Sequence, residues 1–255
     1  MVSEKNRHLS LFAAISLVIS SMVGTGVFTS LGYQLVDIQS VFAILMLWLV
    51  GGVISLFGAL SYCELASALP KSGGEYYLLS RILHPSVGLS AGIVSATVGF
   101  SAPAVLAAIA LATYISPIAP FVNIKIVAIF VILLMNLMHA SSLDTGKSFQ
   151  VWSTFLKVLI MISFISIGFL YDDKQSISFI PRSEDLRILF SPEFAVNLVW
   201  VSYAYAGWNS SIYVVGEIIN PKKNIFRSVL IGTLIVTVLY VLLNYVFLLI
   251  SPINA

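Results

Sequence analysis

The sequence predicts an all-α protein that crosses a membrane several times. Composition is the first reason, because 59% of the 255 residues are hydrophobic, 9% are charged and the mean hydropathy is +1.00. A soluble domain of this length does not reach such values. Apolar runs of about 20 residues, the length needed to cross a bilayer, are the second reason. The net charge of +2 gives no indication of a nucleic-acid partner.

Seven apolar runs define the expected spans of a single transmembrane domain over residues 1–255. They cover residues 9–35, 41–65, 87–115, 124–140, 149–170, 194–219 and 228–250. The third run is long enough to be tilted in the bilayer. After the second run, Pro70 is expected to end the helix, and residues 76–83 are expected to form a short interfacial helix. After the sixth run, Pro221 is expected to end the helix.

The basic residues predict that the N-terminus lies in the cytoplasm. With this orientation, inside segments hold eight Lys and Arg residues and outside segments hold four, as the positive-inside rule requires. The inside set is Lys5, Arg7, Lys71, Arg81, Lys147, Lys222, Lys223 and Arg227, and the outside set is Lys125, Lys174, Arg182 and Arg187. We therefore expect a multi-pass protein of the cell membrane.

The first run is interrupted near its middle by small and polar residues. They are Ser20, Ser21, Gly24, Thr25 and Gly26. Glycine costs a helix ~1 kcal/mol relative to alanine, so the helix is expected to unwind here. Unwound backbone at membrane depth is tolerated where it lines a cavity, and free N–H groups at the start of the second half-helix would suit a carboxylate. The alternative is a close helix–helix contact made by small residues.

The sixth run is interrupted in the same way, by polar and aromatic residues. They are Ser202, Tyr203, Tyr205, Gly207, Trp208, Asn209 and Ser210. Unpaired polar groups are costly in lipid, so these side chains are expected to face the protein interior or water. Two interrupted spans in corresponding places are typical of a transporter built from inverted repeats. The spacing of the breaks predicts a repeat of five helices, with spans one to five as the first copy. Spans six and seven would begin the second copy, inside which the chain ends.

Lys157 stands within the fifth run, and a lysine inside a membrane is by default a functional hypothesis. The alternative is that its ammonium reaches the membrane interface. No acidic residue lies clearly within any run, so paired carboxylates for a proton relay are absent. A lysine that loses and regains its proton could serve instead.

Three motifs resemble those of the amino acid–polyamine–organocation (APC) transporters. Gly24-Thr-Gly-Val-Phe28 resembles the motif of the family's first helix, and Glu64-Leu-Ala-Ser-Ala-Leu-Pro70-Lys-Ser-Gly-Gly-Glu-Tyr76 resembles that of its second. Tyr205-Ala-Gly-Trp-Asn209 with Gly216-Glu-Ile-Ile-Asn-Pro221 resembles that of its sixth helix, nearest the L-type and neutral amino acid permeases. The resemblance implies a LeuT-like inverted-repeat fold and transport of amino acids rather than enzyme chemistry, with no cofactor and no metal.

The same resemblance implies roles for individual residues. N–H groups of Thr25 and Gly26 would bind the substrate carboxylate, and carbonyls near Met22 and at Ala206 would receive its ammonium. Tyr203, Tyr205, Trp208 and Asn209 would shape or gate the side-chain pocket. Ser21, Val23, Gly24 and Gly207 complete the expected substrate site. Lys157 would occupy the place of a sodium ion, which favours sodium-independent proton symport or exchange.

Two departures from the family pattern matter. The family's helices eight to twelve are missing, so the alternative is a truncated fragment that does not transport. No cysteine lies between spans three and four, so no disulfide-linked heavy chain is expected; Cys63 is the one cysteine in the sequence.

Two remote alternatives come from other classes of protein. A seven-span receptor or retinal protein would place its N-terminus outside, against the distribution of basic residues. An intramembrane serine protease would use Ser90 in Gly88-Leu-Ser-Ala-Gly92, with His139 as the candidate base. We expect Gly88 and Gly92 to serve in helix packing instead.

Overall fold

The computed structural model describes residues 7–141, 143–175, 177 and 180–250, which are mainly helical. The described residues form no strand; Leu9 and Ile218 make an isolated parallel bridge. Within these described ranges, five stretches are long and apolar enough to span a membrane: Leu11–Asp37, Val41–Ala68, Pro85–Ile115, Phe149–Leu170 and Pro221–Ile250. The prediction of a polytopic helical membrane protein is therefore confirmed. The chain divides into two compact units, residues 1–72 with 154–255 and residues 73–153.

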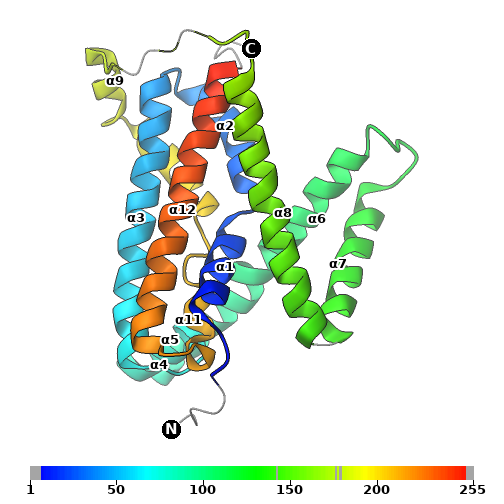
Figure 1. Ribbon diagram of the computed structural model, residues 1–255, viewed down its shortest axis with the longest axis vertical. Coiled ribbons are helices and arrows are strands. Elements are labelled where there is room, and N and C mark those ends of the chain that lie inside the picture. Colours follow the sequence, from blue (N-terminus) through cyan, green and yellow to red (C-terminus); the bar gives the residue numbers. More distant parts are fainter. Residues whose placement is uncertain (1–6, 142, 176, 178–179, 251–255) are drawn as a thin grey trace. The chain divides into compact units, whose positions relative to one another are not determined.

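The first unit is built around a pair of long helices. These are α3 (Val41–Ala68) and α12 (Pro221–Ile250), which lie side by side in Figure 1. Small residues allow the close approach, since a Cβ atom on Gly52 would lie 2.5 Å from the Thr237 methyl group. Helix α1 (Leu11–Met22) packs on α12 at Gly232, where a Cβ atom would lie 2.7 Å from Val18.

Three further helices pack within the first unit. Helix α2 (Gly26–Asp37) packs against α10 (Pro192–Ala204), and α10 also contacts α3. The second half of α8 (Leu143–Leu170) reaches α12, where Phe164 and Phe247 make an edge-to-face ring contact. The largest fully buried side chain of the core is Trp48. Burial of apolar side chains on several helices at once holds the first unit together.

The second unit contains two helix pairs. Helix α4 (Gly74–Ile82) packs on α5 (Pro85–Val94), and α6 (Ala102–Ile115) packs on α7 (Ile124–Ser141). Helix α4 confirms the expected short helix after Pro70. A Cβ atom on Gly88 would overlap Ser80 of α4, and one on Gly92 would lie 3.1 Å from the Tyr76 ring. The prediction that these glycines serve in packing is confirmed.

A π-helix, η2 (Ser95–Ser101), joins α5 to α6 and was not predicted. Pro103 stands two residues after it, in the first turn of α6. Proline has no N–H and its ring clashes with the carbonyl four residues earlier, which disfavours continuous α-helical bonding at this point. The wider turn accommodates the proline, and the Ser101 hydroxyl donates to the Ala96 carbonyl five residues back, at 2.7 Å.

One boundary prediction is wrong. Pro221 does not end the sixth helix but is the first residue of α12, which therefore begins seven residues before the expected start at 228. The first helical position suits proline, because its missing N–H would have no partner there. The sixth run ends earlier, in the short helices α11 (Ser210–Tyr213) and η3 (Val215–Glu217).

Outside the spans, α9 (Ser183–Ile188) is tied to the start of α3 through Asp185. Its carboxylate accepts hydrogen bonds from the Ser40 hydroxyl at 2.6 Å and from the Arg182 N–H at 2.8 Å. These two hydrogen bonds lower the pKa of Asp185 below its ordinary value.

Replacing Asp185 by Asn should lower the thermal midpoint slightly at neutral pH. A depressed pKa contributes stability that is present above the unfolded-state value of about 3.9 and is lost as pH falls through the folded-state value. The difference between wild type and Asp185→Asn should therefore close as the pH falls below about 4. Melting curves across pH check this, with Glu184→Gln on the same helix as the control. A gap that persists unchanged in acid would contradict it.

Candidate functional site

The first helix break lies between α1 and α2, at Val23, Gly24 and Thr25. The Val23 N–H makes the last bond of α1, to the Ile19 carbonyl at 2.8 Å. Thr25 precedes α2, and its side chain makes no capping bond to the helix. The expected unwinding in this run is confirmed. The N–H groups in the first turn of α2 donate no hydrogen bond to the Thr25 side chain.

The second helix break follows α10, which ends at Ala204. The chain turns over residues 205–209 and resumes as α11 at Ser210. Gly207 has a φ of +114°, a conformation that strongly favours glycine. The interruption predicted for the sixth run is therefore a full break of the helix.

The two breaks touch each other. A Cβ atom on Gly207 would lie 2.5 Å from the Ser21 carbonyl oxygen, and one on Gly26 would lie 3.1 Å from the Cα of Ala204. The Ser210 hydroxyl also donates to the Leu17 carbonyl of α1 at 3.3 Å. The glycines thus let the backbone segments at the two breaks meet, which a larger side chain on Gly207 would prevent.

Tyr240 of α12 lies against both breaks. Its hydroxyl oxygen is 2.7 Å from the Met22 carbonyl oxygen and 3.2 Å from that of Ala204, which are the last residues of α1 and α10. Helix-end carbonyls lack intrahelical donors, and the single hydroxyl proton of Tyr240 is shared between the two ends. The Tyr240 ring packs between Trp48 and Tyr205, with centroid distances of 5.5 and 5.0 Å.

Lys157 of α8 reaches the end of α1. Its Nζ donates to the Ser20 carbonyl oxygen at 3.3 Å. A cation at a helix C-terminus interacts favourably with the helix dipole and with the unpaired carbonyls there. The ammonium thus contacts the broken helix itself.

The other expected site residues divide between exposed and packed positions. Five of these residues are exposed, namely Ser21, Gly24, Thr25, Ala206 and Tyr203. Three are buried, namely Met22, Val23 and Tyr205, and four are partly buried, namely Gly26, Gly207, Trp208 and Asn209. Tyr205 is fully buried and donates to the Trp48 carbonyl at 3.0 Å. Trp208 makes an edge-to-face contact with Tyr62 of α3. Through these contacts, Tyr205 and Trp208 hold the second break against α3.

Tyr240 and Trp48 were missed by sequence reasoning. Both lie in uninterrupted apolar runs, where an aromatic residue is ordinarily a packing residue. The one available signal was the hydroxyl of Tyr240, since a buried tyrosine usually finds a hydrogen-bond acceptor.

The sequence model of the family described as "Amino acid permease" matches residues 9–255. The chain belongs to the amino acid permease family. Among its relatives, the mouse (Mus musculus) large neutral amino acids transporter small subunit 2 is 26% identical over 250 residues, covering 94% of this chain and 47% of the relative. The human (Homo sapiens) cystine/glutamate transporter is 29% identical over 252 residues, covering 96% of this chain and 50% of the relative.

The mouse Asc-type amino acid transporter 1 is also similar, at 27% identity over 252 residues. The match covers 94% of this chain and 47% of that relative. The chain therefore spans about half the length of these curated relatives. Their names describe transporters, and the permease chain is not an enzyme. The Ser90 hydroxyl donates to the Ser86 carbonyl within α5, at 3.0 Å.

Proposed function

We propose that the two helix breaks bind an amino acid in a sodium-independent transporter that works by alternating access. The observation that carries the proposal is the contact between the breaks, in which Gly207 meets Ser21 and Gly26 meets Ala204. Each break exposes backbone that a helix would otherwise use internally. A zwitterionic ligand needs N–H donors for its carboxylate and carbonyl acceptors for its ammonium, and both kinds of group occur here.

The substrate carboxylate would bind the N–H groups at the start of α2, near Thr25 and Gly26. The positive end of the helix dipole favours an anion there. The ammonium would bind the Ala206 carbonyl and the second lone pair of the Met22 carbonyl, whose other lone pair accepts from Tyr240. Ser21, Val23 and Gly24 would line the path between them.

The substrate side chain would lie near Tyr203, Trp208 and Asn209, and we propose a neutral L-amino acid. Among the expected site residues in the described ranges, the only side chain with a formal charge is Lys157. The names of the relatives include neutral and anionic substrates, so the direct test compares both classes.

The wider arrangement follows from the same site. We propose a LeuT-like inverted repeat within a single transmembrane domain, in which α1 and α2 correspond to α10 and α11. Rocking of these broken helices would open the site to each side in turn. The N-terminus would lie in the cytoplasm and the protein in the cell membrane. We propose no disulfide-linked heavy chain, because no cysteine lies between spans three and four and Cys63 is buried within α3.

The first experiment screens single amino acids for thermal stabilisation of the purified chain, with and without sodium. A ligand at ~100 times its Kd stabilises a fold by ~2.7 kcal/mol if it binds only the folded state. Stabilisation by a few neutral L-amino acids, unchanged by sodium, would support the proposal. No stabilisation by any amino acid would contradict binding by this chain and would favour a fragment that does not transport.

Replacing Lys157 by Ala should remove the pH dependence of amino acid binding. We propose that this lysine is the proton-coupling group, because its ammonium contacts α1 two residues before Met22. Wild type should then bind more tightly at about pH 5.5 than at pH 7.5, and Lys157→Ala should bind equally at both. Isothermal titration measures this, with Lys125→Ala as the matched loss of charge. Equal pH dependence in wild type and Lys157→Ala would overturn the assignment.

A further inference from the structure

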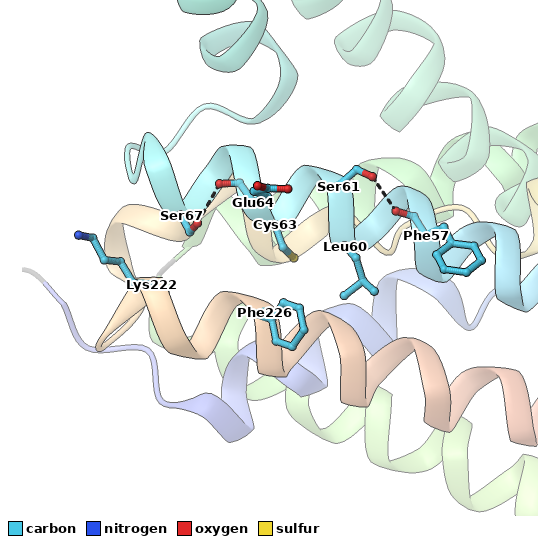
Figure 2. A pocket seen from close by; sticks show the side chains of 8 residues that line it. All are labelled: Phe57, Leu60, Ser61, Cys63, Glu64, Ser67, Lys222 and Phe226. Carbon is cyan, nitrogen blue, oxygen red and sulfur yellow. Dashed lines mark hydrogen bonds between the residues drawn. The ribbon is translucent and has the colours of Figure 1, made fainter.

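A groove runs between α3 and α12, at the end of the pair where α3 ends and α12 begins. It has a volume of about 470 Å³. Its lining comprises Phe57, Leu60, Ser61, Cys63, Glu64 and Ser67 of α3 with Lys222 and Phe226 of α12. Figure 2 shows Lys222 and Ser67 at one end of the groove and Phe57 at the other. The groove is therefore apolar along part of its length and polar at one end.

Membrane geometry gives the two ends different surroundings. Helix α3 has 28 residues and α12 has 30, which is longer than the ~20 residues that cross the hydrocarbon core. The first turn of α12 carries Lys222 and Lys223, so we expect this end of the helix at the lipid head groups. Phe57 lies ten residues before Ser67, about 15 Å along the helix, at the depth of acyl chains. The side chains of Phe57 and Phe226 are 65% and 46% exposed, so this part of the groove is open.

A second hollow of about 380 Å³ shares Lys222 with the groove. It is lined by Arg7, Pro70, Asn220, Pro221, Lys222 and Lys223. The lining thus holds three cations and no acid. The Nε atom of Arg7 is buried without a hydrogen-bond partner in the described part of the chain. Three cationic side chains on one lining favour an anionic ligand in this hollow.

Glu217 and Glu64 lie near the hollow, but neither lines it. Glu217 faces His8, with 3.5 Å between Oε2 and Nε2. Glu64 is on the groove wall, between Ser61 and Ser67, and does not line the cationic hollow.

We propose that the groove and the cationic hollow together bind one anionic phospholipid. Its phosphate would lie at Arg7, Lys222 and Lys223, and one acyl chain would lie along Leu60, Phe57 and Phe226. A groove that opens to the membrane is filled by lipid, and clustered cations at head-group depth select lipids of opposite charge. A soluble anion would leave the apolar part empty, and a zwitterionic lipid would leave net positive charge unbalanced. The site shares no residue with the two helix breaks, so it stands independently of the proposed function.

The test measures lipid retention on the purified chain by native mass spectrometry, with phosphatidylglycerol and phosphatidylcholine of identical acyl chains. Phosphatidylglycerol should be retained preferentially. Each basic residue near a membrane surface contributes about fivefold in affinity, so the double variant Lys222→Gln/Lys223→Gln should weaken retention by about 25-fold. The double variant Lys125→Gln/Lys174→Gln removes the same charge elsewhere and should leave the retention of phosphatidylglycerol unchanged. Phe226→Ser, at an exposed position, should weaken phosphatidylglycerol retention without abolishing the preference.

Three outcomes would overturn the proposal. Equal retention of the two lipids would show that the cations do not select the head group. Equal loss in the two double variants would show that the effect is general surface charge. If inorganic phosphate and phosphatidylglycerol compete for the site at the same concentration, the phosphate contacts alone account for binding and the acyl chain is not bound. The amino acid screen tests the proposed function separately, since none of these substitutions lies in a helix break.

Discussion

Gly207→Ala should destabilise the protein by about 2–4 kcal/mol and abolish amino acid binding. Two effects add at this position. The φ of +114° strains any residue with a Cβ atom, and that atom would lie 2.5 Å from the carbonyl oxygen of Ser21. Backbone cannot rotate aside as a flexible side chain can, so relief requires the two breaks to separate. Thermal unfolding in detergent measures the loss of stability.

Gly24→Ala is the matched control for this prediction. Gly24 lies in the first break, but a Cβ atom there would have no heavy atom within 4 Å, and its φ is not positive. Its thermal midpoint should stay close to that of wild type. If both variants melt at the same temperature, the contact between the breaks does not contribute to stability, and the arrangement described for Gly207 is wrong.

Tyr240→Phe should loosen both helix breaks at once. The change keeps the ring between Trp48 and Tyr205 but removes the hydroxyl that lies between the Met22 and Ala204 carbonyl oxygens. A buried acceptor left without its donor costs about 1–3 kcal/mol. Amide hydrogen exchange should accelerate in residues 20–27 and 203–210 together, because one hydroxyl serves both helix ends.

Tyr33→Phe makes the same chemical change on α2, at a side chain that is 74% exposed. Exchange at the breaks should be unaffected by it. Acceleration in only one of the two segments after Tyr240→Phe would mean that the hydroxyl serves a single helix end. Unchanged exchange in both segments would contradict the role of Tyr240.

The two breaks could be predicted because they disturb a strong pattern. Glycine and hydroxyl residues are conspicuous inside an apolar run, and Gly24 and Gly26 mark the first break directly. The sequence did not distinguish the two glycines, however. Only the structure shows that Gly26 faces Ala204 while Gly24 faces open space. Which glycine matters for packing depends on tertiary contacts that local sequence does not encode.

The missed features have physical reasons of the same kind. Tyr240 lies in a continuous apolar run, so nothing local separates its role from that of Tyr245 on the same helix. Pro221 is compatible with either a helix end or a helix start, and the lysines after it do not decide between them. The cationic hollow brings Arg7 together with Lys222 and Lys223, which lie more than 200 positions later in the sequence.

Equilibrium binding of a radiolabelled neutral amino acid, in competition with blocked analogues, tests the central claim most directly. The wild-type chain in lipid nanodiscs should bind the amino acid found in the thermal screen. Its methyl ester lacks the carboxylate, its N-acetyl derivative lacks the ammonium, and each should compete at least tenfold more weakly. Both losses together would support a site made from the N–H groups of one break and the carbonyls of both. Saturable binding in which the two analogues compete as well as the parent amino acid would contradict it.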